Sequence, residues 1–129
     1  MTDDAAFGRR MFEELNPHRA GLPERDAAFG GELRQLAADT VFGKIWPRPG
    51  LSVRDRSLVT LGILIALRAE GELEYHFPMA LRNGLTYEEL EEVVYHSAIY
   101  AGFPAAHAAQ LKGREVLDRE PAEDPEAGR

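Results

Sequence analysis

A carboxylate and an imidazole lie one helical turn apart near the middle of the chain. Glu72 and His76 are four residues apart, so a helix places them on one face. Leu73, Met79 and Ala80 flank them there. A carboxylate can hold an imidazole in one tautomer and raise its proton affinity, as a general acid or base requires. The pair predicts a proton-transfer site, with an ordinary ion pair or a hydrogen-bonded core histidine as the alternative.

Three arginines near a predicted helix start are candidates for binding an anionic substrate. Arg54 and Arg56 open the segment after a Pro-rich connection, and Arg48 lies within that connection. Arginine binds carboxylates through two parallel hydrogen bonds, so the cluster favours a small carboxylate substrate. Asp55 lies between two of them, and simple solvation of all three is an equal alternative.

One tryptophan and two histidines are further candidates for binding the substrate. Trp46 could line a pocket, although a place in the core is favoured. His96 follows Glu92 by four residues and lies away from the apolar face of its helix, which favours a solvated pair or a contact with another subunit. His107 lies in an alanine-rich stretch, where it could point into a cavity or border one.

Several kinds of site are excluded or disfavoured by the residues present. The chain has no cysteine, which excludes disulfides, thiolate metal sites and thiol nucleophiles. It contains no glycine-rich phosphate loop, no His-Glu-x-x-His helix and no Gly-x-Ser-x-Gly turn. The four histidines are scattered, so we expect no metal site.

Composition limits the partners and the location of the protein. The 129 residues are enough for one domain, and the net charge of −7 argues against nucleic-acid binding. No apolar run reaches the ~18 residues that a membrane-spanning helix needs. The start, residues 1–4, lacks the pattern of a secretory signal. We therefore expect a cytoplasmic protein without membrane contact.

Helical periodicity predicts the elements that position these residues. We expect an N-terminal helix and turn-rich arm over residues 1–23, a helical domain over 24–119 and a disordered tail over 120–129. Within the domain, residues 24–45 predict an amphipathic helix ending at Trp46 and Pro47. Residues 58–67 are apolar all round, which predicts a helix enclosed by neighbours on every side. The expected apolar face of the first of these helices consists of Phe29, Leu33, Leu36, Ala37, Val41 and Ile45.

The remaining helix boundaries have clear local signals. A helix over 72–83 should end at Gly84, the residue type best suited to a left-handed stop. Thr86 and Glu89 predict a capping box at the next helix start, and that helix should end at Gly102. Pro104 opens a last helix to about residue 117. The sequence therefore predicts an all-α fold.

Five segments, in order, resemble the carboxymuconolactone decarboxylase family. The resemblance covers roughly residues 25–118. Its segments are Phe42-Gly43-Lys44-Ile45-Trp46-Pro47-Arg48-Pro49-Gly50-Leu51, Arg54-Asp55-Arg56-Ser57-Leu58, Glu72-Leu73-Glu74-Tyr75-His76, Ala80-Leu81-Arg82-Asn83-Gly84-Leu85-Thr86 and Ala98-Ile99-Tyr100-Ala101-Gly102-Phe103-Pro104-Ala105-Ala106.

The resemblance implies a fold, an assembly and a reaction. It implies the AhpD-like bundle of about six helices, assembled as a homotrimer or homohexamer with sites near subunit contacts. The implied reaction is decarboxylation of a carboxylated lactone such as 4-carboxymuconolactone, which needs no cofactor because the lactone carbonyl accepts the electron pair. In this interpretation His76 is the acid/base, Glu72 orients it, and Arg48, Arg54 and Arg56 bind carboxylate or enolate.

The chain departs from related patterns at several positions. The Cys-x-x-Cys pair of the peroxidase branch falls on Ala69 and Glu72, which excludes thiol peroxidase chemistry. His107 stands where the decarboxylases usually have asparagine, and Pro78 follows His76 by two residues. A changed pocket therefore stays open, and with it two alternatives. They are a cofactor-free lyase, isomerase or cyclase acting on another enolisable carbonyl compound, and a non-catalytic helical oligomer that binds a small ligand.

Overall fold

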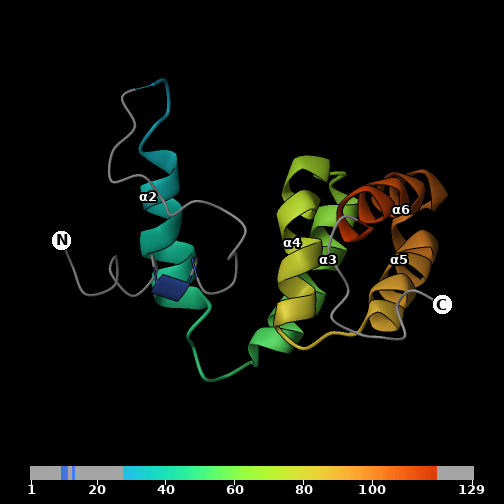
Figure 1. Ribbon diagram of the computed structural model, residues 1–129, viewed down its shortest axis with the longest axis horizontal. Helices are drawn as coiled ribbons and strands as arrows, with labels where there is room; N and C mark the ends of the chain where they lie inside the picture. Colours follow the sequence, from blue (N-terminus) through green and yellow to red (C-terminus); the bar gives the residue numbers. More distant parts are fainter. Residues whose placement is uncertain (1–9, 12, 14–27, 119–129) are drawn as a thin grey trace. The chain divides into compact units, whose positions relative to one another are not determined.

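The described part of the chain is helical throughout. The computed structural model describes residues 10, 11, 13 and 28–118, which contain no strand. The tail at 120–129 and most of the arm at 1–23 lie outside the described residues. Figure 1 shows α2 (Leu33–Ala37), a π-helix that continues it (Ala38–Ile45), α3 (Val53–Ala66), α4 (Glu70–Arg82), α5 (Tyr87–Ala101) and α6 (Phe103–Leu117). The predicted all-α class is confirmed.

The chain divides into two compact units, Met1–Arg56 and Ser57–Arg129, and each is described by itself. The single domain expected over residues 24–119 stays a prediction. Among the described residues, no helix is both long and apolar enough to cross a membrane.

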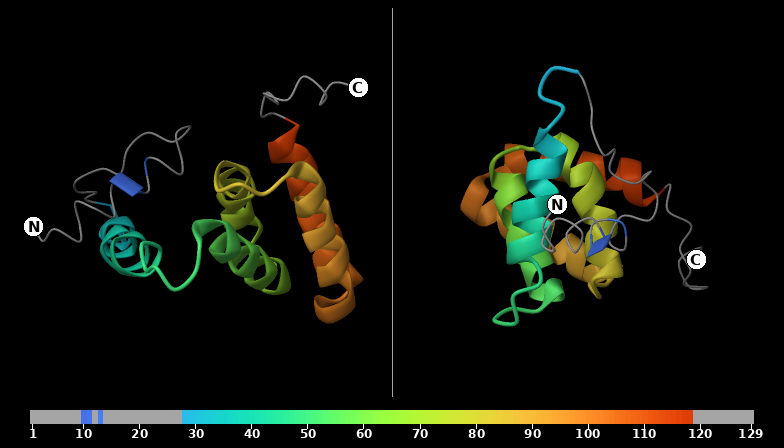
Figure 2. Two further views of the ribbon diagram at one scale, coloured as in Figure 1. Left: turned by 90° about the horizontal axis from the view of Figure 1, so that it is seen from below. Right: turned by 90° about the vertical axis from the view of Figure 1, so that its left-hand side faces the viewer.

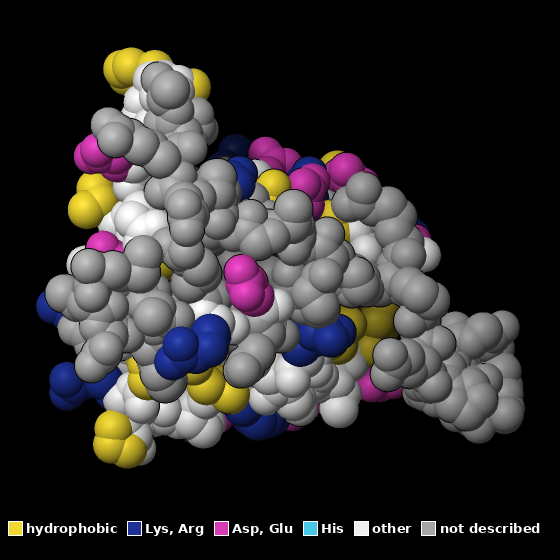
Figure 3. Space-filling model, turned by 60° about the vertical axis from the view of Figure 1, so that its left-hand side comes forward, with side chains coloured by type: hydrophobic (Ala, Val, Ile, Leu, Met, Phe, Trp, Pro, Cys, Tyr) yellow, Lys and Arg dark blue, Asp and Glu magenta, His cyan; other side chains and the backbone are white. Residues whose placement is uncertain are grey.

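In the first unit, the predicted apolar face of the helix was wrong. Ala38, Phe42 and Trp46 form the buried row. The rings of Phe42 and Trp46 stack with centroids 6.1 Å apart. Most of the predicted face is exposed (Phe29, Leu33, Leu36, Val41 and Ile45), and apolar side chains are visible at the surface near the N-terminal end of α2 (Figure 3).

The π-helix ends where the sequence predicted the helix to stop. The N–H of Trp46 donates to the carbonyl of Val41 over 2.9 Å, five residues back. The hydroxyl of Thr40 donates to the carbonyl of Leu36, a type of contact that competes with regular helix hydrogen bonds. Helices of this kind are rare and are frequent at functional sites.

The second unit packs α4, α5 and α6 with most of α3 around one core. Figures 1 and 2 show α3 beside α4 and α5 beside α6. Residues 58–67 were predicted to be enclosed by neighbours on every side, and this prediction was wrong. Within this stretch only Leu61 and Ile65 are buried, on the same row as Ser57. Val59 and Ile63 are exposed. The core cluster comprises Leu61, Ile65, Leu73, Phe77, Ala80, Leu85, Leu90, Ala105, Ala109 and Val116.

The predicted signals for the end of α4 and the start of α5 are confirmed. Gly84 has φ +106°, a conformation that favours glycine because glycine has no Cβ. The N–H of Leu85 donates to the carbonyl of Ala80 over 3.0 Å. Thr86 and Glu89 form the predicted capping box, with bonds of 2.9 and 3.0 Å. A cap of this kind contributes about 1 kcal/mol. These local interactions fix where α4 ends and α5 begins.

Candidate active site

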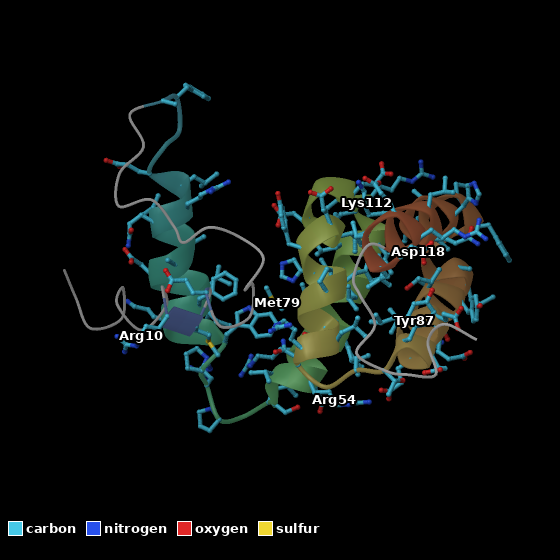
Figure 4. All side chains as sticks on the ribbon, in the orientation of Figure 1. Arg10, Arg54, Met79, Tyr87, Lys112 and Asp118 are labelled. Atoms are coloured by element: carbon cyan, nitrogen blue, oxygen red, sulfur yellow. The ribbon has the colours of Figure 1, made fainter. Side chains whose placement is uncertain are left out.

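The helix α4 carries both members of the predicted proton-transfer pair. Glu72 lies in its first turn and is exposed, whereas His76 is half-buried one turn later. Leu73, Met79 and Ala80 are buried along the same helix, and Met79 is labelled in Figure 4. Pro78 lies inside α4 without ending it. The His76 imidazole is therefore partly shielded from water.

Two opposing effects set the proton affinity of His76. Burial is the larger effect and lowers the pKa of the imidazole below its ordinary value of 6.5, while the charge of Glu72 raises it. The sequence correctly predicted the direction of the carboxylate's effect, but not the larger opposing effect of burial. The His76 ring therefore favours its neutral form, and a nearby negative charge would favour protonation.

The first unit contains the predicted arginines and Trp46. Trp46 is buried, with an exposed fraction of 5%, which fits the favoured core interpretation. Arg54 forms an ion pair with Asp55 at 3.2 Å, and Arg56 Nη2 donates to the carbonyl of Arg48 at 3.0 Å. The last contact orients the Arg56 guanidinium, whereas Arg54 (labelled in Figure 4) is already paired with Asp55.

The remaining candidates, His96 and His107, lie on α5 and α6 of the second unit. His96 is exposed on α5, where its ring lies 5.1 Å from that of Tyr100, and His107 is exposed on α6. The arginines and His76 belong to different units, so their combination in one site stays a prediction. Within residues 10, 11, 13 and 28–118, no group of three or more histidine or acidic residues could hold a metal ion.

The second unit contains a cavity of about 230 Å³ that was not predicted from the sequence. Tyr87, Glu91 and Tyr95 line it from one face of α5, and none of the predicted site residues does. Burial, followed by the charge of Asp118, raises the pKa of the Tyr87 phenol (both labelled in Figure 4). The four-residue spacing of Tyr87, Glu91 and Tyr95 was the signal that could have pointed to it. The full lining is Phe77, Tyr87, Leu90, Glu91, Val94, Tyr95, Gln110, Gly113, Arg114 and Leu117.

Comparisons with known proteins point to one family. The model of the carboxymuconolactone decarboxylase family matches residues 31–111. A 4-carboxymuconolactone decarboxylase from Acinetobacter baylyi is 40% identical over 89 residues, which cover 69% of this chain and 66% of that protein. A nitrosuccinic acid decarboxylase from Metarhizium robertsii is 36% identical over 136 residues, covering 92% and 91%. An uncharacterized 15.0 kDa protein from Paracoccus denitrificans is 31% identical, covering 90% and 89%.

Proposed function

The chain belongs to the carboxymuconolactone decarboxylase family, and we propose that it is a cofactor-free decarboxylase of a carboxylated lactone such as 4-carboxymuconolactone. The observation that carries this proposal is the half-buried His76 on α4, with the charge of Glu72 acting on it. The names of two relatives, both decarboxylases, support it.

In the proposed reaction, the substrate supplies its own electron sink. The bond between the ring carbon and the departing carboxylate breaks, and its electron pair moves into the lactone carbonyl as CO2 leaves. The enolate that remains takes a proton at carbon. The protonated ring of His76 donates that proton and is then reprotonated from water, so the protein supplies a positioned acid and stabilises the developing charge.

The substrate's negative charge has two roles in this mechanism. Arg48, Arg54 and Arg56 bind carboxylate or enolate oxygens, and the contact of Arg56 with the Arg48 carbonyl orients its guanidinium. A bound anion near His76 also raises the pKa of the imidazole. Binding of the substrate thus restores the protonated form that burial disfavours in the free enzyme.

We propose that the protein is a homotrimer or homohexamer in which α5 and α6 contribute to subunit contacts. Ile99, Tyr100 and Phe103 are large apolar residues with exposed fractions of 72%, 81% and 72%. Exposed apolar patches commonly mark protein contacts. His96 and His107 lie on the same two helices, so we place them near these contacts, where they complete substrate binding by a neighbouring subunit.

The mechanism predicts the effect of Glu72→Gln on the pH dependence of kcat/KM. Activity falls as pH rises through the pKa of His76, because the protonated ring is the donor. Removing the carboxylate lowers that pKa further, so the basic limb of the profile should move to lower pH. The loss relative to the unmodified enzyme should therefore be larger at pH 7 than at pH 5.5.

Glu70→Gln is the matched control, because Glu70 is also an exposed acid in the first turn of α4. It removes the same charge from the helix end, and it should leave the limb in place. A limb that is unmoved in Glu72→Gln, or displaced to higher pH, contradicts the assigned role of Glu72.

A second candidate function is decarboxylation of a nitro-substituted dicarboxylate. The Metarhizium relative aligns along 92% of this chain, a larger share than the Acinetobacter relative. In nitrosuccinic acid, the nitro group can accept the electron pair that the departing CO2 leaves, as the lactone carbonyl does. The same acid and the same carboxylate-binding groups would serve both reactions.

Release of CO2 from purified enzyme distinguishes these candidates. With 4-carboxymuconolactone and nitrosuccinate tested side by side, we expect kcat/KM to be at least about tenfold higher for the lactone, the size of a difference of 1.4 kcal/mol. Faster turnover of nitrosuccinate would favour the second candidate. No CO2 from either substrate, with the helical fold intact by circular dichroism, would refute the decarboxylase proposal.

A further inference from the structure

Two buried polar side chains join α3 to α4. Asn83 Nδ2 donates a hydrogen bond of 2.8 Å to Ser57 Oγ, and the exposed fractions of these residues are 9% and 2%. We propose that Ser57 and Asn83 are positioning residues whose hydrogen bond sets the register of α3 against the His76 face of α4. This inference rests on the proposed function, because what the bond positions is the face of α4 that carries the proton donor.

On α4, the hydrogen bond and the proton donor share one face. His76 and Asn83 are seven residues apart, about two turns of helix, so they lie above one another at a separation of roughly 10 Å along the axis. Met79 and Ala80 lie between them and are buried. The bond to α3 is therefore made at the C-terminal end of the strip that carries the imidazole.

On α3, the hydrogen bond lies at the start of the buried row. Ser57, Leu61 and Ile65 recur every four residues and form the buried row of this helix. Leu61 and Ile65 belong to the core cluster that also contains Leu73, Phe77 and Ala80 of α4. The two helices lie side by side in Figures 1 and 2. A shift of α3 along α4 would therefore displace the buried α4 residues next to His76.

Apolar contacts alone would hold this register loosely. Leucine and isoleucine side chains attract one another without strong direction, so a shifted register could also bury them. A slide of one turn would leave the hydroxyl of Ser57 and the amide of Asn83 buried without each other, which is unfavourable for both groups. A single buried asparagine sets the register of paired helices in coiled coils in the same way.

The first test compares two buried serines. Ser57→Ala should lower kcat for 4-carboxymuconolactone about tenfold or more, because small displacements of reacting groups are costly. The pH limb should stay in place, since His76 and Glu72 are unchanged. Ser97→Ala removes a hydroxyl from α5 with an exposed fraction of 9% and should change kcat less than twofold at a similar cost in Tm. Equal losses in the two variants would show general loosening and overturn the proposal.

Asn83→Ala extends this test to both ends of the hydrogen bond. The double variant with Ser57→Ala should lose no more activity than either single variant, because both remove one interaction. If the loss of activity in the double variant equals the product of the two single losses, the two residues do not act through their common bond.

A second measurement does not depend on activity. The chain has no cysteine, so spin labels can be placed at Val59→Cys and Arg82→Cys, which are exposed on α3 and α4. With labelled chains diluted in unlabelled protein, Ser57→Ala should shift or broaden the distance distribution, and Ser97→Ala should not. An unchanged distance distribution in Ser57→Ala overturns the inference. If the distribution shifts in Ser57→Ala but the wild-type enzyme releases no CO2, only the decarboxylase function is refuted.

Discussion

Replacement of His76 by alanine should lower kcat at least about a hundredfold while the helical fold remains intact. General acid catalysis contributes about 10²–10⁴-fold to a rate, and His76 is the half-buried histidine beside Glu72 on α4. Alanine is a good helix former, and the side chain it replaces is only partly buried, so folding should be little affected. Steady-state CO2 release measures the loss, and circular dichroism measures the fold.

Two further variants make this result specific. His76→Gln retains hydrogen-bonding groups and much of the side-chain volume but cannot deliver a proton near neutral pH, so its kcat should be as low as that of His76→Ala. His96→Ala removes an exposed imidazole from α5, and its effect should be below tenfold. Full turnover by a folded His76→Gln enzyme would remove His76 from the mechanism.

The helix boundaries could be predicted because their causes are local. The capping box of Thr86 and Glu89 joins residues three apart, and the positive φ of Gly84 needs only the absence of a side chain. Such signals are readable from a few neighbouring residues. The end of the first helix at Trp46 was predictable for the same reason, because Pro47 follows it.

The buried faces could not be predicted in the same way. Leu33, Ala37, Val41 and Ile45 recur every four residues, and so does the row of Ala38, Phe42 and Trp46. Periodicity identifies both rows as apolar and does not choose between them. The stacking of Phe42 on Trp46 and the π-helical hydrogen bonding belong to the folded chain. Likewise, the apolar composition of residues 58–67 did not reveal that Val59 and Ile63 face away from the core.

The placement of Glu72 and His76 on one helix was predictable, but the electrostatic balance at His76 was not. The four-residue spacing of Glu72 and His76 placed them on one helix and gave the direction in which the carboxylate shifts the imidazole pKa. The larger effect, burial, depends on helix packing that no spacing encodes. The Ser57–Asn83 hydrogen bond spans 26 residues of sequence, so no local pattern pointed to it.

Arg56→Lys should raise KM for the carboxylated substrate about 10- to 100-fold, although the charge is retained. Lysine presents a point charge, whereas arginine presents a planar fork that matches a carboxylate. The substitution also removes the contact from Arg56 Nη2 to the Arg48 carbonyl, which orients the group. Hydrogen bonds to charged groups contribute about 1.5–3 kcal/mol, and each 1.4 kcal/mol corresponds to about tenfold in affinity.

Arg82→Lys is the matched control, because Arg82 is exposed at the end of α4. It makes the same chemical change and should leave KM within twofold of the unmodified enzyme. Initial rates over a range of substrate concentrations separate KM from kcat, and raising the salt concentration should increase KM further where charge attraction guides the substrate. An unchanged KM in Arg56→Lys would mean that solvation, the alternative equally compatible with the sequence, accounts for this arginine.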